Sequence, residues 1–450
     1  MGDQEARLAA RLERAASALA AGPAVGSLGG EDSSLLRDLG YDDGDGAKAE
    51  GRARMLRAAA KFRRLFILPV PDAPGVVFFG GEADPAVVGT WRERPPIGNL
   101  SGSGLSPQRA FEACVGEGVE YLSQFVQADD RTECGPLADY SQVYDADTKR
   151  FVSEVLAAGK IDAGRSITWV PARRLPDGAI AWFPLDLYCR RPTVEQEFAP
   201  PLKLSTGCAA GATVAAATLR ALLELIERDA VALWWRGGRR GRAIGSDDEA
   251  GRAAAELLAQ VRQGNAGRNT WLLDITTDTK VPAVAAASAR PDGYGFSYGF
   301  GARTSLAEAA RAAIFELCQV ELGQHVVAAK RQESGDGALN ESDRRQLRRG
   351  TLFDTRDCAL LQPQIGLDST AVDVPSDPDS ALDHVVERLK VLGISAYAIV
   401  LTRPQFGVPV VRVLAPGLQL EPCQIVGARL ARTIIETGGG ALHHGGMALL

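Results

Sequence analysis

The sequence is poor in histidine, and its cysteines are scattered. The chain of 450 residues has four histidines, His325, His384, His443 and His444, so a histidine-rich metal centre or proton relay has little material to work with. The seven cysteines are odd in number and nowhere form a Cys-x-x-Cys pair. Neither a zinc ribbon nor a disulfide framework is expected, and the cysteines are predicted to be reduced thiols. Any chemistry must therefore rest on carboxylates and arginines.

Long apolar runs and an excess of positive charge are also missing. No run approaches the roughly 20 apolar residues of a membrane-spanning helix, and the first residues lack the basic-then-apolar order of a signal peptide. A cytoplasmic protein with no membrane partner is expected. The net charge of −6 disfavours nucleic-acid binding. The one basic run, Arg236, Arg239, Arg240 and Arg242, is interpreted as a solvated loop.

Composition divides the chain into three parts. Residues 4–20 have helical periodicity and precede a Gly, Ser and Asp-rich stretch, so residues 1–65 are interpreted as a helical extension with a flexible link. Residues 66–425 form the main domain and 426–450 a tail. The polar stretch 332–349 predicts a surface insertion. The tail's His443 and His444 sit beside glycines and indicate frayed chain rather than a metal site.

Strands and helices alternate through the main domain. Short runs rich in β-branched and aromatic residues predict strands, whereas the long Ala, Leu and Glu-rich segments predict helices. The fold class is therefore α/β or α+β. The strand candidates are residues 66–70, 75–80, 166–175, 179–188, 270–276, 281–289, 395–403 and 408–416.

Three segments share one layout, a Gly-containing turn followed by an Ala-rich helix that carries two polar residues at i and i+3. These pairs lie on one helical face. The interval from Gly104 to Glu117 equals that from Gly211 to Glu224, thirteen residues, which indicates a repeated unit. The pairs are Glu117 with Glu120, Glu224 with Glu227, and Glu316 with Gln319.

Carboxylates from separate helices could hold a magnesium ion together with substrate phosphates. The alternative is that glutamates at this spacing belong to ordinary exposed helix faces. Glu224, Glu227 and Arg228, however, lie in the strongly apolar helix LLELIERDAVALWW, where a charge is costly unless it is paired or liganded. The Glu224–Arg228 pair could also satisfy itself without any nucleotide. Cys114, Cys208, Trp234 and Trp235 are expected in the core.

The motifs resemble those of the YcaO family. SGSGLSPQRAFEACVGEGVEY is similar to a Gly-rich entry followed by S-x-x-E-x-x-E-R, and STGCAAGATVAAATLRALLELIERDAVALWW is similar to the family's longest motif. FELCQ resembles its E-x-x-Q motif, and LTRPQFGVPVVRVLAPGLQLEP its closing strand. The resemblance covers residues 95–425. It implies an ATP-binding fold with mixed or antiparallel sheets and packed helices.

The resemblance also implies a reaction and its ligands. ATP phosphorylates a peptide-backbone amide oxygen after a nucleophile adds to the carbon, which gives an azoline or a macrocyclic amidine in a ribosomally made precursor peptide. Attack by external sulfide would give a thioamide and need a sulfur-delivery partner. No residue is assigned as catalytic. By motif position, ATP with Mg²⁺ is expected to be bound by Glu117, Glu120, Glu224, Glu227, Arg228, Glu316 and Gln319, with Glu117, Glu120, Glu224 and Glu316 as metal ligands.

Several family positions are altered. Ser103 replaces a lysine, Cys114 a serine, Tyr121 an arginine, Ala212 an asparagine and Ala216 a glutamate. The proline-rich end of azoline-forming members is also absent, and this favours the divergent, stand-alone type found in bottromycin-like pathways. A catalytically silent scaffold that binds precursor peptide is therefore an alternative. The sequence leaves a leader-binding partner protein and a homodimer open.

Overall fold

The computed structural model describes residues 3–21, 30–41, 45–162, 164–175, 177–364, 366, 368–444 and 446–449. The chain divides into two compact units. Unit 1 comprises residues 1–68, 77–222 and 395–415, and unit 2 comprises residues 69–76, 223–394 and 416–450.

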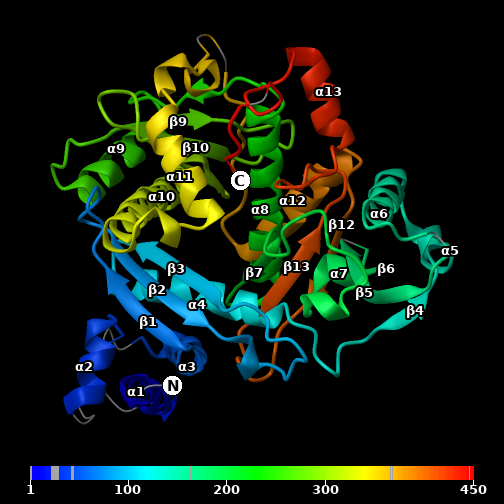
Figure 1. The fold of residues 1–450 in the computed structure, drawn as a ribbon, viewed down its shortest axis with the longest axis horizontal. Helices are drawn as coiled ribbons and strands as arrows, with labels where there is room; N and C mark the ends of the chain where they lie inside the picture. The colour runs from blue at the N-terminus through cyan, green and yellow to red at the C-terminus, as the bar shows by residue number, and fades with distance from the viewer. Residues whose placement is uncertain are drawn as a thin grey trace. The chain divides into compact units, whose positions relative to one another are not determined.

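Unit 1 contains an N-terminal group of helices and a three-stranded antiparallel sheet. The helices are α1 (Asp3–Ala21), α2 (Gly30–Asp38) and α3 (Gly46–Ala59), and α1 packs against α2 and α3. The sheet runs in the order β1 (Arg64–Leu68), β2 (Val77–Ala83) and β3 (Gly98–Gly104). Helix α4 (Pro107–Ser123) packs against β2 and β3 (Figure 1).

A six-stranded antiparallel sheet forms the rest of unit 1. Its order is β4-β5-β12-β13-β7, with β6 paired to β5, so β13 is an interior strand. The strands are β4 (Glu133–Gly135), β5 (Ile167–Leu175), β6 (Ile180–Pro184), β7 (Cys208–Ala210), β12 (Ala396–Val400) and β13 (Val410–Leu414). The helices of this part are α5 (Leu137–Tyr140), α6 (Ala146–Ala158) and α7 (Leu185–Tyr188).

Helix α8 (Val214–Trp235) begins in unit 1 and belongs to unit 2 from Leu223. Unit 2 has an antiparallel sheet in the order β11-β10-β9-β8, with α10 packed on β10 and β11. The strands are β8 (Arg242–Ala243), β9 (Asn269–Asp274), β10 (Ala283–Ala289) and β11 (Ser297–Ala302). The helices are α9 (Glu249–Arg262), α10 (Leu306–Ser334), α11 (Glu341–Leu352), α12 (Pro378–Val391) and α13 (Ala428–Thr437).

The predicted class is confirmed, since helices pack on antiparallel sheets throughout the described chain. All seven cysteines are free thiols, and Cys114, Cys208, Trp234 and Trp235 are buried as expected. Within the described ranges, no helix is both long enough and apolar enough to cross a membrane.

Two segments differ from the sequence expectation. The predicted flexible link contains α2. Residues 22–29 and 42–44 of the link lie outside the described part. The polar insertion 332–349 is on the surface but mostly helical. Asn340 and Asp343 form a reciprocal capping box that satisfies the first amides of α11, which explains how so polar a segment starts a helix.

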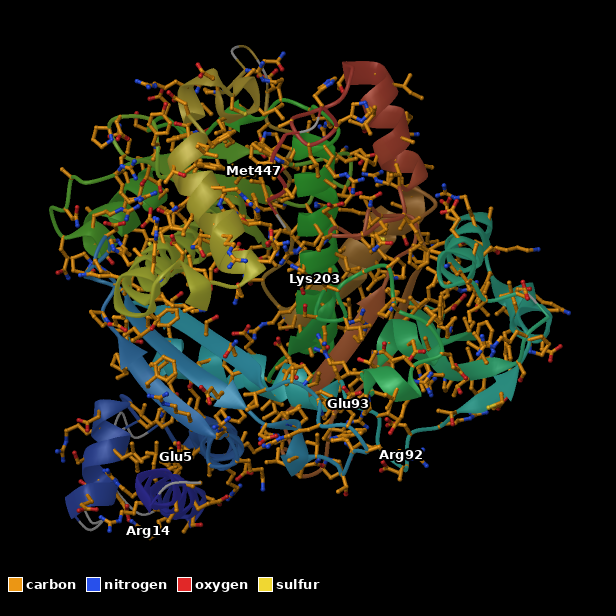
Figure 2. The ribbon with its side chains drawn as sticks, in the orientation of Figure 1. Glu5, Arg14, Arg92, Glu93, Lys203 and Met447 are labelled. Atoms are coloured by element: carbon orange, nitrogen blue, oxygen red, sulfur yellow. The ribbon has the colours of Figure 1, made fainter. Side chains whose placement is uncertain are left out.

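The C-terminal segment is part of unit 2. Helix α13 begins after Gly427, and the chain beyond it returns to the end of α8. The Trp235 indole donates to the Met447 carbonyl at 2.6 Å, and Leu449 is buried in the aromatic core with Phe296. Figure 2 shows Met447 among the side chains of this unit. His443 and His444 are exposed in the turn between.

Candidate functional site

Strand β3 and helix α4 hold the first glutamate by a backbone hydrogen bond. Ser106 caps α4 by accepting from the Arg109 amide, and Pro107 follows at the first helical position, where a missing N–H costs nothing. A Cβ at Gly102 would lie 2.2 Å from the Ala110 carbonyl oxygen, so glycine allows the strand and helix backbones to approach. The Glu117 carboxylate then accepts from the amide and hydroxyl of Ser101, at 2.6 and 3.0 Å.

Strand β11 and helix α10 repeat this arrangement in unit 2. Ser305 caps α10 by accepting from the Glu308 amide. A Cβ at Gly299 would lie 2.2 Å from the Ala313 carbonyl oxygen. The Glu316 carboxylate accepts from the Phe300 amide at 2.6 Å, and the interval between these two residues is 16, as it is between Ser101 and Glu117. The first and third segments therefore have the same arrangement of a strand followed by a capped helix.

The second glutamates of α4 and α8 each contact the strand that precedes the next helix of the series. Glu120 accepts from the Ala210 amide at 2.7 Å, where β7 ends before α8. Glu227 accepts from the Ala302 amide at 3.2 Å, where β11 ends before α10. These bonds satisfy backbone amides at the ends of the two strands. The repeated carboxylates therefore have a role in the fold before any ligand is considered.

Unit 2 gathers three of the predicted glutamates around one arginine. Arg228 lies 3.4 Å from Glu224 and 3.9 Å from Glu227. Burial alone would lower the pKa of Arg228, but the charges of Glu224, Glu227 and Glu316 raise it overall. Burial, followed by the nearby charge of Glu227, raises the pKa of Glu316 to about 7. Carboxylates are therefore crowded together here, and one arginine offsets only part of their charge.

The pKa of Glu117 in unit 1 is also raised. Desolvation by the surrounding protein disfavours the ionised carboxylate, although part of the Glu117 residue is exposed to solvent. The two hydrogen bonds from Ser101 favour the ionised form and oppose this shift. Of the seven predicted residues, unit 1 holds Glu117 and Glu120, whereas unit 2 holds the other five. Gln319 lies one turn after Glu316 on α10 and is half-buried.

The carboxylate oxygens of the predicted glutamates are the type of ligand that Mg²⁺ prefers. Magnesium prefers hard oxygen ligands and takes one or two carboxylates plus substrate phosphates rather than a full protein cage. The described residues include no group of three or more acidic, histidine or cysteine side chains that could hold a metal alone. Burial and then the nearby charge of Glu227 raise the pKa of Glu316, so a cation bound beside these carboxylates would reduce their repulsion.

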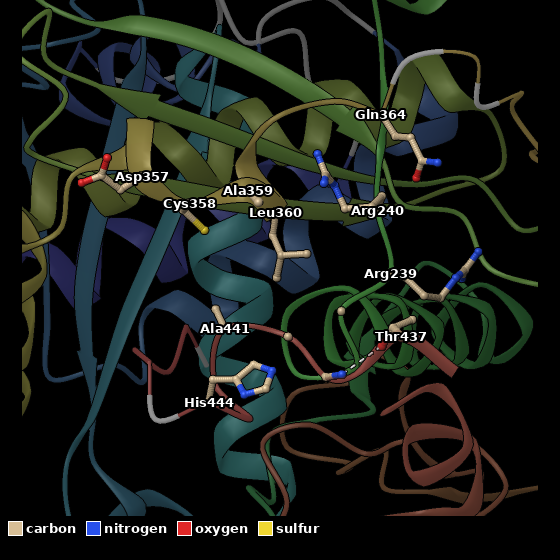
Figure 3. A pocket seen from close by; sticks show the side chains of 13 residues that line it. Arg239, Arg240, Asp357, Cys358, Ala359, Leu360, Gln364, Thr437, Ala441 and His444 are labelled. Atoms are coloured by element: carbon tan, nitrogen blue, oxygen red, sulfur yellow. Dashed lines mark hydrogen bonds between the residues drawn. The ribbon is translucent and has the colours of Figure 1, made fainter. Parts of the chain in front are cut away.

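A cavity of about 750 Å³ lies elsewhere in unit 2, at the end of α8 (Figure 3). None of the seven predicted residues lines it. Arg239 and Arg240 do, together with Cys358, Leu360 and His444. The expected solvated arginine loop is thus wrong in part, because Arg240 donates to the Gln362 carbonyl at 2.9 Å and Arg236 pairs with Glu421 at 2.5 Å.

A family model described as a YcaO cyclodehydratase that binds ATP and Mg²⁺ matches residues 101–419. The chain belongs to the YcaO family. The expected family is confirmed, and the description of the family agrees with the expectation of ATP with Mg²⁺. No curated protein matches the sequence.

Several solved structures share the fold. A heterocyclase in complex with substrate and cofactor has a TM-score of 0.66 at 24% identity, covering 84% of this chain and 52% of that one. YcaO from Methanopyrus kandleri, bound with AMPPCP and Mg²⁺, has a TM-score of 0.57 at 19% identity and coverages of 85% and 91%. The Escherichia coli microcin synthetase McbBCD complex gives 0.58 at 16%, with coverages of 79% and 88%. This chain spans about half the length of the first heterocyclase.

Sequence reasoning missed the backbone amides that hold the YcaO glutamates. Ser101, Ala210, Phe300 and Ala302 donate through their main chain, and only Ser101 also donates through its side chain. The 16-residue interval shared by the Ser101–Glu117 and Phe300–Glu316 contacts was the available signal. Tyr121, at an altered family position, donates to the Pro96 carbonyl, and the Arg190 guanidinium lies 5.3 Å from its ring centroid.

Proposed function

We propose that this YcaO protein uses ATP to activate a backbone amide of a ribosomally made precursor peptide for cyclodehydration, giving an azoline or a macrocyclic amidine. The observation that supports it best is the crowding of Glu227 and Glu316, each bonded to a β11 amide, beside Arg228. Like charges held together in a half-buried place destabilise the fold unless a cation offsets them.

The glutamates and Arg228 have distinct tasks in this proposal. Glu117, Glu120, Glu224 and Glu316 would hold Mg²⁺, and Glu227, Arg228 and Gln319 would complete the nucleotide site. Bound Mg-ATP supplies the phosphoryl group that makes the amide oxygen a leaving group. The backbone bonds at Ser101 and Phe300 fix two of the carboxylates before binding, so little ordering is needed when the ligand arrives.

The substrate is a precursor peptide in which a side chain or the N-terminal amine attacks the amide carbon. The amide oxygen leaves as phosphate, so ATP becomes ADP and phosphate while the peptide loses the elements of one water. The related synthetase and heterocyclase structures contain partner proteins or substrate, and a leader-binding partner protein is proposed here by analogy. A cytoplasmic location and a homodimer belong to the same proposal.

Calorimetric titration with Mg-AMPPCP tests the nucleotide site. We expect the Glu117→Gln, Glu224→Gln double variant to weaken binding at least about tenfold, which corresponds to about 1.4 kcal/mol. Glu308→Gln is the matched control, because Glu308 lies exposed in the first turn of α10 and should leave the affinity within about twofold. An unchanged affinity in the double variant would show that these carboxylates hold no nucleotide.

The catalytically silent scaffold has its own support, because Ala212 and Ala216 lack polar side chains at two altered family positions. The two functions separate on one measurement. Incubation of the pathway's precursor peptide with Mg-ATP, followed by mass spectrometry, should show loss of one water per event. Peptide binding without nucleotide binding or mass loss would favour the scaffold, and a thioamide would appear as exchange of oxygen for sulfur.

A further inference from the structure

The cavity at the end of α8 lies within unit 2 and is enclosed by three segments of the chain. They are the loop after α8, residues 357–364 and the turn that follows α13. Hydrogen bonds hold two of these walls on α8. The Trp234 indole donates to the Leu360 carbonyl at 3.0 Å, and the Gly440 amide donates to the Arg236 carbonyl at 2.8 Å. The cavity of about 750 Å³ is therefore built into the fold.

The basic run of the sequence divides into two arginines that are paired with carboxylates and two that are not. Arg236 and Arg242 each form an ion pair, at 2.5 and 3.0 Å. Arg239 and Arg240 instead donate to main-chain carbonyl oxygens, at 3.4 and 2.9 Å, and form no ion pair with the described residues. These two arginines are the ones that line the cavity. Their positive charge is therefore available to a ligand there.

Arg240 has a donor group that a ligand can reach. Its Nη2 donates to the Gln362 carbonyl, whereas its Nη1 forms no hydrogen bond within the described part of the chain and is not buried. The side chain is half-exposed at the cavity. A guanidinium donates strongly to a carboxylate, because both groups are charged. Arg240 can therefore bind an anion without giving up its bond to the protein.

Much of the remaining lining is apolar. Cys358, Leu360 and Ala441 line the cavity, and all three belong to the aromatic core of unit 2 or pack against it. Burial raises the pKa of the Cys358 thiol, so this group is neutral at neutral pH. Figure 3 shows Leu360 between Arg240 on one side and His444 on the other. The cavity therefore offers an apolar surface beside a cationic donor.

The charges of the lining residues favour a monoanion. The two arginines and the exposed Asp357 give two positive charges and one negative, a net charge of +1 when His444 is neutral. Asp278, whose charge also acts on Arg239, lies outside the lining and is bonded to Arg429 at 3.0 Å. A carboxylate matches this net charge, whereas a phosphate dianion would exceed it and would be repelled more strongly by Asp357.

We propose that this cavity binds a carboxylate group carried on an apolar body. Arg240 donates to the carboxylate, Arg239 adds favourable charge, and the apolar wall around Leu360 covers the attached hydrocarbon. Such a ligand is either a peptide segment with an acidic residue beside an apolar one, or a free organic acid. None of the seven residues predicted for the nucleotide site lines this cavity. The inference therefore does not depend on the proposed peptide chemistry.

The test is a titration of the full chain in EDTA, followed by saturation-transfer NMR of the ligand. Hexanoate is the probe, and hexanamide has the same apolar body without the charge. We expect hexanoate to bind at least about tenfold more tightly than hexanamide, because a hydrogen bond to a charged group contributes about 1.5 to 3 kcal/mol. A terminally blocked Leu-Asp-Leu peptide separates the two sources. Tighter binding than hexanoate indicates a peptide ligand, and weaker binding indicates a free acid.

Three variants and a control locate the site. Arg240→Gln should weaken hexanoate binding at least about tenfold, and Arg239→Gln by about two- to fivefold, because it contributes charge alone. Ala359→Trp keeps both arginines but places an indole at the cavity, where Ala359 is exposed, and should also weaken binding at least about tenfold. Arg345→Gln is the control, since Arg345 is exposed on α11 of the same unit.

Three results would overturn the proposal. The first is no binding of hexanoate, and the second is equal binding of hexanoate and hexanamide, which would show an apolar surface alone. The third is hexanoate binding that is unchanged in both Arg240→Gln and Ala359→Trp. If Arg240→Gln does not fold, Ala359→Trp decides the assignment. Failure of the nucleotide titration would leave this test unaffected, because it is made without Mg²⁺ or ATP.

Discussion

Replacing Glu316 by glutamine should remove a pH dependence of stability from the ligand-free protein. The pKa of Glu316 is raised from 4.5 to about 7, chiefly by burial and then by Glu227. The folded state therefore binds a proton that the unfolded state has released between these values. The contribution of this group to stability is fully present below about pH 4.5 and is lost as the pH rises through 7.

The size of the effect follows from the shift. A difference of 2.5 pH units, 7 minus 4.5, multiplied by about 1.36 kcal/mol per unit gives about 3 kcal/mol. Unfolding entropy of roughly 2.1 cal/mol/K per residue over 450 residues converts this to about 3 to 4 °C. The wild type should therefore lose about this much thermal stability, relative to Glu316→Gln, between pH 4.5 and pH 8.

The assay is thermal unfolding in EDTA across this pH range. Glutamine keeps an acceptor oxygen for the Phe300 amide but cannot ionise, so the folded structure is preserved while the titration is removed. Glu308→Gln is again the control, because that residue lies exposed on the same helix. The reasoning is refuted if wild type and Glu316→Gln show parallel stability profiles from pH 4.5 to 8.

Two further substitutions test the packing of unit 2. Gly299→Ala places a methyl group 2.2 Å from the Ala313 carbonyl oxygen. It should lower the free energy of unfolding by about 1 to 3 kcal/mol, as measured by urea unfolding. Gly337→Ala is the control, because a Cβ there would have nothing within 4 Å, and it should leave stability nearly unchanged. Asp229→Asn weakens the pair with Arg429, 2.9 Å away and fully buried at its acidic end. It should cost about 3 to 5 kcal/mol, and a loss no larger than that of the exposed Asp373→Asn would contradict this.

The sequence predicted the strands that are rich in β-branched and aromatic residues, but not those that hold the site. Residues 98–104 and 297–302 are rich in glycine, and glycine lowers strand propensity, so the first was interpreted as a turn. In both strands glycine allows the following helix to approach closely. Tertiary packing therefore overrides local propensity at these positions.

The candidate site was predictable as residue types but not as contacts. The i and i+3 spacing placed Glu224, Glu227 and Arg228 on one face of α8, and the structure places them together. The complete burial of Arg412 gave no signal either, because in sequence it is one arginine in an apolar strand.

Glu120 and Glu227 accept hydrogen bonds from the backbone amides of Ala210 and Ala302. The presence of these two glutamates in the sequence is therefore not by itself a sign of nucleotide binding. An apolar replacement would remove a charge but leave a peptide N–H without its acceptor, at a cost of about 1 to 3 kcal/mol. Selection for folding alone can therefore preserve these residues after nucleotide contacts are lost. Substitution by glutamine keeps the acceptor and so tests nucleotide binding alone, whereas substitution by alanine changes both folding and nucleotide binding. An alanine scan of this fold would overstate how much each glutamate contributes to catalysis.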